Sequence, residues 1–198
     1  MKATAKKVYG NDSLTGKKIG VQGIGQVGKH LVEYLVKEHA DVFITDIFED
    51  KVKAVAKELH VTGVAPDSFY DKDMDIYAPC ALGATINDDT IARLNCSIIA
   101  GAANNQLKDE TRHGFMLIDK SITYAPDFLI NAGGLINVYH EHLGNYNRKR
   151  VFEQVENIYT TCTNILTLAG NEKITSQEAA IKLSEKRIAQ IGRIRQSF

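Results

Sequence analysis

A glycine-rich turn, Gly23-Ile24-Gly25-Gln26-Val27-Gly28, constrains the fold of this chain more than any other feature. The preceding residues 17–22 (KKIGVQ) predict a strand, and apolar residues recur at helical spacing over 31–36. In a strand–turn–helix of this kind the first glycine permits a tight turn and the second lets the backbone approach a pyrophosphate. The third allows the helix to pack closely on the strand. The turn therefore predicts the start of a dinucleotide-binding βαβ unit, with free amides near Gln26 and Val27 for the phosphates.

An acidic residue stands where such a unit requires one. Residues 42–45 (VFIT) predict a short buried strand, and Asp46 follows it, roughly 20 residues beyond the turn. A carboxylate at this point can accept hydrogen bonds from both adenosine ribose hydroxyls and would repel a 2′-phosphate. No arginine follows immediately, so we expect NAD rather than NADP. The alternative is a turn used only for packing, with Asp46 as an ordinary loop acid.

Strands and helices continue to alternate as far as residue 130. Further strands are predicted at 75–78, 97–100 and 122–125, a helix at 49–59, and a helix capped by Asn87. Alternation of this kind predicts an α/β fold, a doubly wound, mainly parallel, Rossmann-like sheet. From Asn131 onward the pattern is helical only, with a long apolar stripe over 151–169 and a last helix, 177–194, capped by Ser176.

Two units are expected from this pattern. Residues 1–145 would form the NAD-binding domain, opened by a short amphipathic helix, and residues 146–198 a C-terminal helical extension packed on it. The final helices would also pack in part against a further domain or a neighbouring subunit, because their apolar surface would otherwise be exposed.

Charge and composition exclude several classes of partner. The chain has 24 basic and 24 acidic residues, so it has no electrostatic footprint for nucleic acid or an anionic membrane. It has no apolar run of roughly 20 residues and no signal peptide. Three scattered cysteines among 198 residues form neither a disulfide framework nor a zinc pattern. A cytoplasmic protein fits best.

Histidines give no metal site. His140 and His142 are two residues apart, so they would not share a helix face, and His113 lies far from both in sequence. We expect all three at the surface and no bound metal.

Three loops follow predicted strands and combine small residues with amides. They are residues 78–83 (APCALG), 101–106 (GAANNQ), and 125–127 (APD) leading to 131–134 (NAGG). Ligands of open parallel sheets bind at the carboxyl ends of strands. Such loops suit a flat neutral ring with a carboxamide, such as nicotinamide. Asn and Gly are also common in ordinary turns, which is the alternative for each loop taken alone.

The motifs together resemble one family across almost the whole chain. They are Gly23–Gly28, Ala78–Gly83, Asn104–Leu107, Arg112–Gly114, Tyr124–Asp127, Ile130–Val138 and Tyr146–Arg148. These segments are similar to the glutamate/leucine/phenylalanine/valine dehydrogenase family, and the last of them most resembles its leucine dehydrogenase branch. The resemblance implies oxidative deamination of an L-amino acid to a 2-oxo acid and ammonia, with NAD as the hydride acceptor.

The resemblance also assigns residues. For the cofactor it implies the turn residues Gly23, Ile24, Gly25, Gln26, Val27 and Gly28, with Asp46 for the adenosine ribose. It also implies Cys80 and Ala81 beside the nicotinamide ribose and Asn104 near the nicotinamide. For the amino acid it implies Asn131 at the substrate, with Leu135 and Val138 lining its side-chain pocket. Two apolar residues suit a branched aliphatic side chain such as that of leucine and oppose a γ-carboxylate. On spacing alone, Leu135 and Val138 would be ordinary helix core.

No catalytic residue is assigned. In this family the catalytic lysines and the proton-transferring aspartate lie in an N-terminal substrate domain, and Lys2, Lys6 and Lys7 do not match their motif. We therefore expect the chain to correspond to the cofactor half of a homo-oligomeric enzyme. The alternatives are a non-catalytic NAD-binding module, a truncated product, and a phenylalanine or valine dehydrogenase of the same family.

Overall fold

The computed structural model describes the backbone of residues 1–195 and the side chains of residues 1–191. The strands are β1 (Lys18–Gln22), β2 (Asp41–Thr45), β3 (Thr62–Gly63), β4 (Ile76–Pro79), β5 (Ile98–Ile99) and β6 (Thr123–Tyr124). The helices are α1 (Lys2–Tyr9), α2 (Gln26–Lys37), α3 (Glu49–Leu59), α4 (Pro66–Phe69), α5 (Asp88–Arg93), α6 (Glu110–Asp119), α7 (Asp127–Ile130), α8 (Gly133–His142), α9 (Arg148–Glu172) and α10 (Ser176–Arg195).

The strands form one parallel sheet in the order β3-β2-β1-β4-β5-β6. The expected α/β, Rossmann-like fold is confirmed, and the order reverses between β1 and β4. In register, Gln22 pairs with Thr45 on one side and with Pro79 on the other, so β1, β2 and β4 end level. This reversal point is where open parallel sheets bind ligands.

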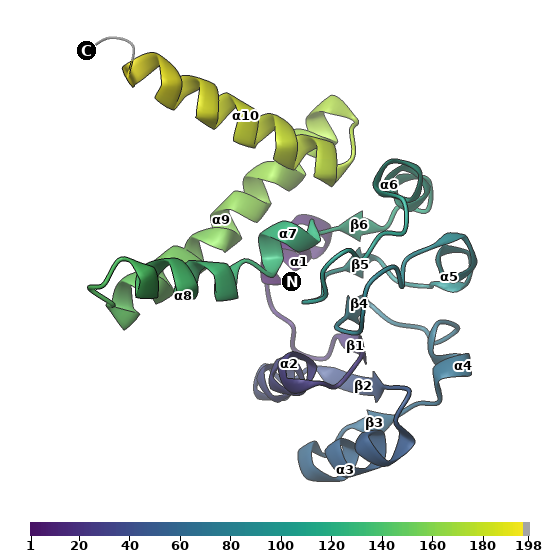
Figure 1. Ribbon diagram of the computed structural model, residues 1–198. Helices are drawn as coiled ribbons and strands as arrows, with labels where there is room; N and C mark the ends of the chain where they lie inside the picture. The colour runs from purple at the N-terminus through teal and green to yellow at the C-terminus, as the bar shows by residue number, and fades with distance from the viewer. Residues whose placement is uncertain (196–198) are drawn as a thin grey trace.

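Helices cover both faces of the sheet (Figure 1). One core lies between the sheet and α1, α2, α3 and α9, and it includes Val32, Val52 and Leu166. The other lies under α4, α5 and α6 and is richer in aromatic residues, with Phe69 and Tyr77 fully buried. The strands are therefore covered on both faces, which explains why they are continuous apolar runs rather than alternating ones.

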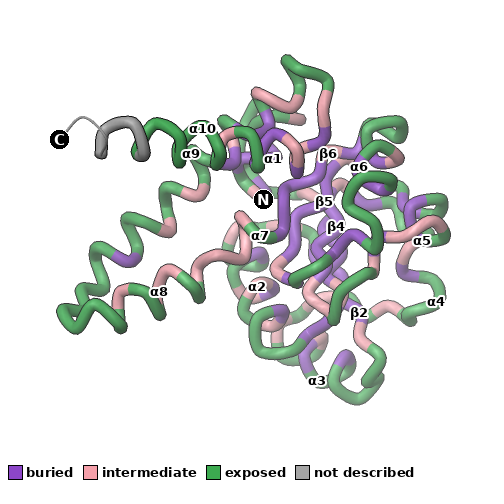
Figure 2. The backbone as a smooth tube through the Cα atoms, turned by 45° about the horizontal axis from the view of Figure 1, so that its top comes forward, coloured by how far each residue is buried: buried purple, intermediate pink, exposed green. Residues whose placement is uncertain are grey.

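The C-terminal helices extend away from this body. Figure 2 shows α8 in the colours of intermediate and exposed residues, and the adjoining part of α9 largely so, while the strands are buried. In that part of α9, Val151 is buried. No residue of α8 is buried. The far end of α9 is different, because Cys162 and Leu166 there join the core beneath α1.

Several local expectations are confirmed and others are corrected. Asn87 caps α5 in a capping box with Thr90. The cap expected at Ser176 is wrong by one residue: the Thr175 hydroxyl accepts from the amide of Glu178, and the Glu178 carboxylate accepts from the amide of Thr175. This is a capping box of the form T-x-x-E.

In the described part of the chain, no helix is long and apolar enough to cross a membrane.

The surface position expected for His113 is also wrong. Its side chain is only 2% exposed. Its Nδ1 atom accepts from the amide of Asp109 at 2.9 Å, so the histidine secures the start of α6 from within. Its Nε2 atom lies 3.7 Å from the carboxylate of Asp88.

Candidate functional site

The glycine turn connects β1 to α2 at the reversal of strand order. Gly23 has φ +89°, a left-handed conformation, and a Cβ placed on it would lie 2.5 Å from the amide nitrogen of Ala81. A Cβ on Gly28 would lie 2.0 Å from the carbonyl oxygen of Gly23. The turn thus permits three close approaches at once: of the backbone to itself, of α2 to β1, and of the turn to the loop after β4.

Gly25 is the exception among these three glycines. A Cβ placed on it would meet no atom within 4 Å. Gly25 is the N-cap of α2 and, in the part of the chain described, no side chain caps that helix. The first-turn amides of α2 therefore face open space at the positive end of the helix dipole, an arrangement that binds anions.

Asp46 lies directly beside the turn. Its Oδ2 atom accepts from the amide of Ile24 at 2.8 Å, and its Oδ1 atom accepts from the amide of Phe48 at 3.1 Å. Each carboxylate oxygen retains a lone pair for a further donor. The carboxylate thus joins the end of β2 to the turn after β1.

A cavity of about 580 Å³ adjoins Asp46. It lies between α3 and the segment from β3 to the start of α4, and Ile47, Val52, Val64 and Pro66 are among its lining residues. The side chains of Ile47 and Phe48 next to Asp46 are 82% and 62% exposed. A largely apolar cavity beside a carboxylate is the kind of space that small ligands occupy.

The three loops predicted from the sequence meet on the other side of the turn. The amides of Ala84 and Ile86 donate to the carbonyls of Asn105 and Gln106 at 2.6 and 2.9 Å. The amide of Gln106 in turn donates to the carboxylate of Asp127 at 3.1 Å. The loops after β4, β5 and β6 are therefore bonded to one another in series.

Asn104 and Asn131 are directly hydrogen-bonded, through the side-chain amide of Asn131 and the side-chain oxygen of Asn104. Asn104 is exposed and Asn131 half-buried. Leu135 and Val138 follow on α8, one helical turn apart, and their side chains are 74% and 58% exposed. In the structure neither of them is helix core.

Cys80 and Ala81 lie where the loop after β4 passes the glycine turn. The amide of Cys80 donates to the carbonyl of Gln22 at 2.7 Å, which continues the strand pairing to the edge of the sheet. Burial raises the pKa of the Cys80 thiol, so this residue is a protonated neighbour of the turn rather than a thiolate.

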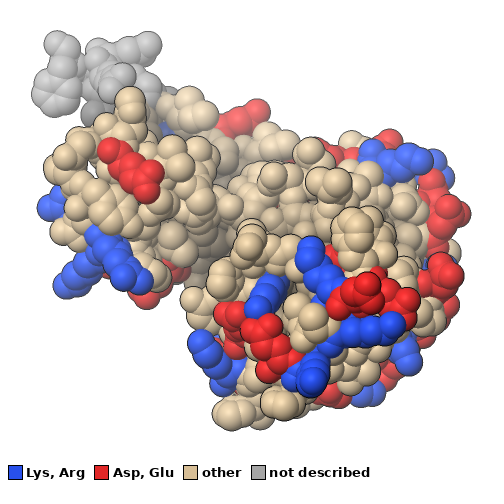
Figure 3. All heavy atoms as spheres, turned by 60° about the horizontal axis from the view of Figure 1, so that its bottom comes forward, with Lys and Arg blue, Asp and Glu red and all other residues tan. Residues whose placement is uncertain are grey.

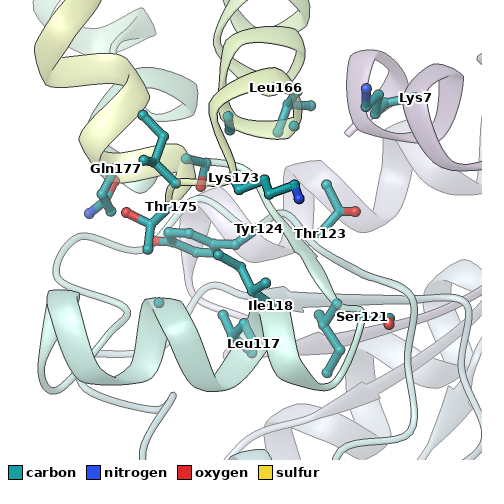
Figure 4. Close-up of a pocket in the computed structure, with 16 residues that line it drawn as sticks. Lys7, Leu117, Ile118, Ser121, Thr123, Tyr124, Leu166, Lys173, Thr175 and Gln177 are labelled. Atoms are coloured by element: carbon teal, nitrogen blue, oxygen red, sulfur yellow. The ribbon is translucent and has the colours of Figure 1, made fainter.

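A further cavity, of about 420 Å³, lies at the opposite end of β6 (Figure 4). Its floor is formed by α6 and the ring of Tyr124, and Lys173 and Thr175 approach it from the turn between α9 and α10. This cavity contains none of the residues predicted for cofactor or substrate. The residues predicted for the cofactor gather at the carboxyl edge of the sheet, and Leu135 and Val138 lie on α8.

The surface charge is mixed. On the face shown in Figure 3, acidic and basic side chains are interspersed over the body of the molecule, as the neutral composition suggests. Among the residues described, no group of three or more His, Cys, Asp or Glu side chains has metal-binding geometry.

Two buried polar residues of the loops were not singled out from the sequence. Gln106 is 0% exposed and Asp127 is 6% exposed, and each bonds to the loop backbones. One signal was present in the sequence: an acid directly after Pro126, at the start of a helix, is a common arrangement of first-turn residues. No local pattern marks Gln106.

Comparisons with known proteins show the family of this chain. The family model described as Glutamate/Leucine/Phenylalanine/Valine dehydrogenase matches residues 43–195. A leucine dehydrogenase of Thermoactinomyces intermedius is 48% identical over 198 residues, which is all of this chain and 54% of that relative. A phenylalanine dehydrogenase of Lysinibacillus sphaericus is 44% identical over 193 residues, covering 95% of this chain and 50% of the relative.

A solved structure is also similar. The crystal structure of an L-tryptophan dehydrogenase from Nostoc punctiforme superposes with a TM-score of 0.94 at 44% identity. The match covers 97% of this chain and 57% of that one. The chain thus spans little more than half the length of the relatives that it matches.

Proposed function

Since the chain belongs to the glutamate/leucine/phenylalanine/valine dehydrogenase family, we propose that it is the NAD-binding part of an amino-acid dehydrogenase acting on L-leucine or a similar branched-chain amino acid. In this proposal residues 1–145 bind the cofactor and residues 146–198 form a helical extension. When bound, NAD would supply the hydride acceptor. The residues of this chain bind and orient the two reactants and exclude water from between them.

The residues at the carboxyl edge fit a dinucleotide. The amides at the start of α2 would hold the pyrophosphate, since Gly25 leaves the approach open. Asp46 would accept from the adenosine ribose hydroxyls with its remaining lone pairs, and the adjoining cavity would take the adenine. Cys80, Ala81 and Asn104 would contact the nicotinamide end.

The substrate would meet this edge from the side of α8. Asn131 would contact the polar end of the amino acid, and Leu135 and Val138 would form one wall for its side chain. Their apolar character supports an aliphatic substrate, because an unpaired carboxylate against them would be strongly unfavourable. Lysine-assisted acid–base chemistry is proposed for the substrate domain of the family, and none is assigned among these 198 residues.

The observation that carries the proposal is the bond between the Ile24 amide and the Asp46 carboxylate at 2.8 Å. It holds together, at the reversal of the sheet, the turn proposed to bind phosphate and the acid proposed to bind ribose. Titration calorimetry of the 198-residue chain tests the proposal directly. We expect NAD to bind, NADP to bind more weakly, and no NADH to form on addition of L-leucine.

Two outcomes would contradict this. Absence of NAD binding to the folded chain would remove the cofactor assignment altogether. Leucine-dependent turnover by the chain alone would show that its own residues supply the acid–base groups.

Preference among leucine, valine and phenylalanine is then measured on the enzyme that contains this chain together with its substrate domain, with and without Leu135→Gly and Val138→Gly.

A further inference from the structure

We infer that Gln106 and Asp127 are positioning residues, a buried polar clamp that holds Asn104 and Asn131 in place for the nicotinamide end of the cofactor. This inference rests on the proposed function, since it concerns the same site. Neither residue of the clamp faces the ligand edge. Each acts through the loop backbones that carry the two asparagines.

The clamp is needed because the sheet barely extends to these loops. The strands β5 and β6 have only two residues each, so few ladder hydrogen bonds determine the course of the chain beyond them. Asn104 is exposed, and Asn105 beside it has φ +51°, in the left-handed region. A loop leaving so short a strand has many accessible conformations unless other bonds select one.

Gln106 supplies such bonds within its own loop. Its side-chain amide donates to the carbonyls of Gly101 at 2.8 Å and Ala103 at 2.9 Å, closing the loop on both sides of Ala102. Its backbone carbonyl accepts from Ile86 of the neighbouring loop. Gln106 therefore determines the path of the backbone that presents Asn104.

The side-chain oxygen of Gln106 is buried and has no hydrogen-bond partner among the described residues. A buried acceptor left unpaired is costly. An apolar side chain of the same length would fill this space without that penalty. The two donor bonds of the side-chain amide, to the carbonyls of Gly101 and Ala103, order the loop.

Asp127 links this loop to the next one. One carboxylate oxygen accepts from the amide of Gln106 at 3.1 Å, and the other accepts from the amide of Phe128 at 2.8 Å. Asp127 stands at the start of α7, whose last residue, Ile130, directly precedes Asn131. Its carboxylate therefore sets the distance between the segments that carry Asn104 and Asn131, whose side chains are hydrogen-bonded.

Tyr124 supports the clamp from behind. Its hydroxyl oxygen accepts from the amide of Asp127 at 3.3 Å, and its ring forms part of the floor of the cavity in Figure 4. Burial raises the pKa of the Tyr124 hydroxyl, so this group stays protonated and neutral beside the Asp127 carboxylate over the working range of pH.

The test compares Asp127→Asn and Gln106→Met with the unaltered chain. Both substitutions keep the approximate volume and remove clamp bonds. Lys120→Met is the matched control, because it removes three hydrogen bonds to the end of α5 and leaves the loops untouched. Amide hydrogen exchange is measured without ligand, and affinities for NAD and for ADP-ribose, which lacks nicotinamide, are measured by calorimetry.

We expect both clamp variants to exchange about tenfold faster over residues 101–106 and 127–131, with residues 23–28 unchanged. Affinity for NAD should fall about tenfold, equivalent to about 1.4 kcal/mol. Affinity for ADP-ribose should stay within about twofold of that of the unaltered chain. The control should change neither. A purely structural role would instead lower the affinities for both ligands together.

The inference is overturned if loop exchange in both variants matches the unaltered chain, or if NAD and ADP-ribose affinities fall equally. It is also overturned if the unaltered chain binds NAD no more tightly than ADP-ribose, because the loops would then contribute nothing to cofactor binding. Failure of the proposed function has a different signature: the unaltered, folded chain binds neither ligand. Where Asp127→Asn does not fold, Gln106→Met decides.

Discussion

The two sides of the ligand edge are built by different means. On the β1–β2 side, the site consists of backbone amides and one carboxylate, and a side chain would fit at only one of its three turn glycines. On the β4–β6 side, three loops are joined in series by bonds between residues far apart in sequence. The first side is determined by close packing and the second by a polar network. The first should therefore fail abruptly on substitution, and the second gradually.

The largest effect is expected from the glycine turn. In Gly28→Ala the added methyl would lie 2.0 Å from the carbonyl oxygen of Gly23, so α2 must move away from β1. We expect a loss of more than about 3 kcal/mol in the free energy of unfolding, measured by urea denaturation, together with loss of NAD binding.

Gly25→Ala is the matched substitution for that test. Its methyl meets no atom of the protein within 4 Å, so the fold should be retained. NAD affinity should fall, because in the proposed site the methyl would project toward the phosphates. Equal stability losses for the two alanine variants would contradict the distinction between a packing glycine and a ligand-facing one.

The next effect concerns the charge on the same side. Asp46→Ala should weaken NAD binding about 10–100-fold, because charge-assisted hydrogen bonds of about 1.5–3 kcal/mol are lost. Binding of NADP should change far less, since the repulsion of its 2′-phosphate is removed at the same time. Calorimetry with both cofactors decides, and equal losses would take Asp46 out of the ribose role.

A smaller effect on stability is expected from substituting single lysines, one in each half of the molecule. In the half of the molecule that contains β4 to β6, the Lys120 ammonium donates to the carbonyls of Ile91, Ala92 and Leu94 at the end of α5 and not to the loops. Lys120→Met should lower the free energy of unfolding by about 1 kcal/mol.

On the turn side, Lys29 forms an exposed ion pair with Glu58 at 2.7 Å. Lys29→Met should leave the denaturation midpoint unchanged, because exposed pairs contribute little. A larger loss for Lys29→Met than for Lys120→Met would show that the hydrogen bonds of Lys120 to the end of α5 add no stability.

The smallest effect concerns the reactivity of two thiols, Cys80 beside the glycine turn and Cys96 before β5. Burial raises the pKa of Cys96 to about 12 and also raises the pKa of Cys80. The thiolate is the reacting form, so alkylation of both by iodoacetamide at pH 8 should be slow in the folded protein and should accelerate as pH rises toward 12. If NAD occupies the proposed site, it should slow the labelling of Cys80 and leave that of Cys96 unchanged, as followed by mass spectrometry.

The same contrast explains what the sequence could predict. The strand, the turn and Asp46 lie within one short stretch, and their pattern is local, so the parallel Rossmann-like sheet and its ligand edge could be predicted from the sequence. The Asn87 cap is local as well. By contrast, Gln106 and Asp127 are 21 residues apart, and their bond exists only because β5 and β6 are neighbours in the sheet.

Other features were missed for related reasons. The strand β3 consists of Thr62 and Gly63, which are both exposed, so no apolar run marks it in the sequence. His113 is buried by helix packing, which its own neighbours in sequence do not reveal. At the start of α10, Thr175 and Ser176 are both good caps, and the reciprocal bonds with Glu178 select the first.

The exposure of α8 has a consequence for how this protein changes over time. Leu135 and Val138 lie on a helix with no buried residue, so folding of this chain depends little on their size or shape. Substitutions there are tolerated by the fold and are free to accumulate. Random libraries at these two positions should yield mostly folded clones, and a lineage under selection for a different side chain can sample alternatives at α8 without first acquiring stabilising changes elsewhere.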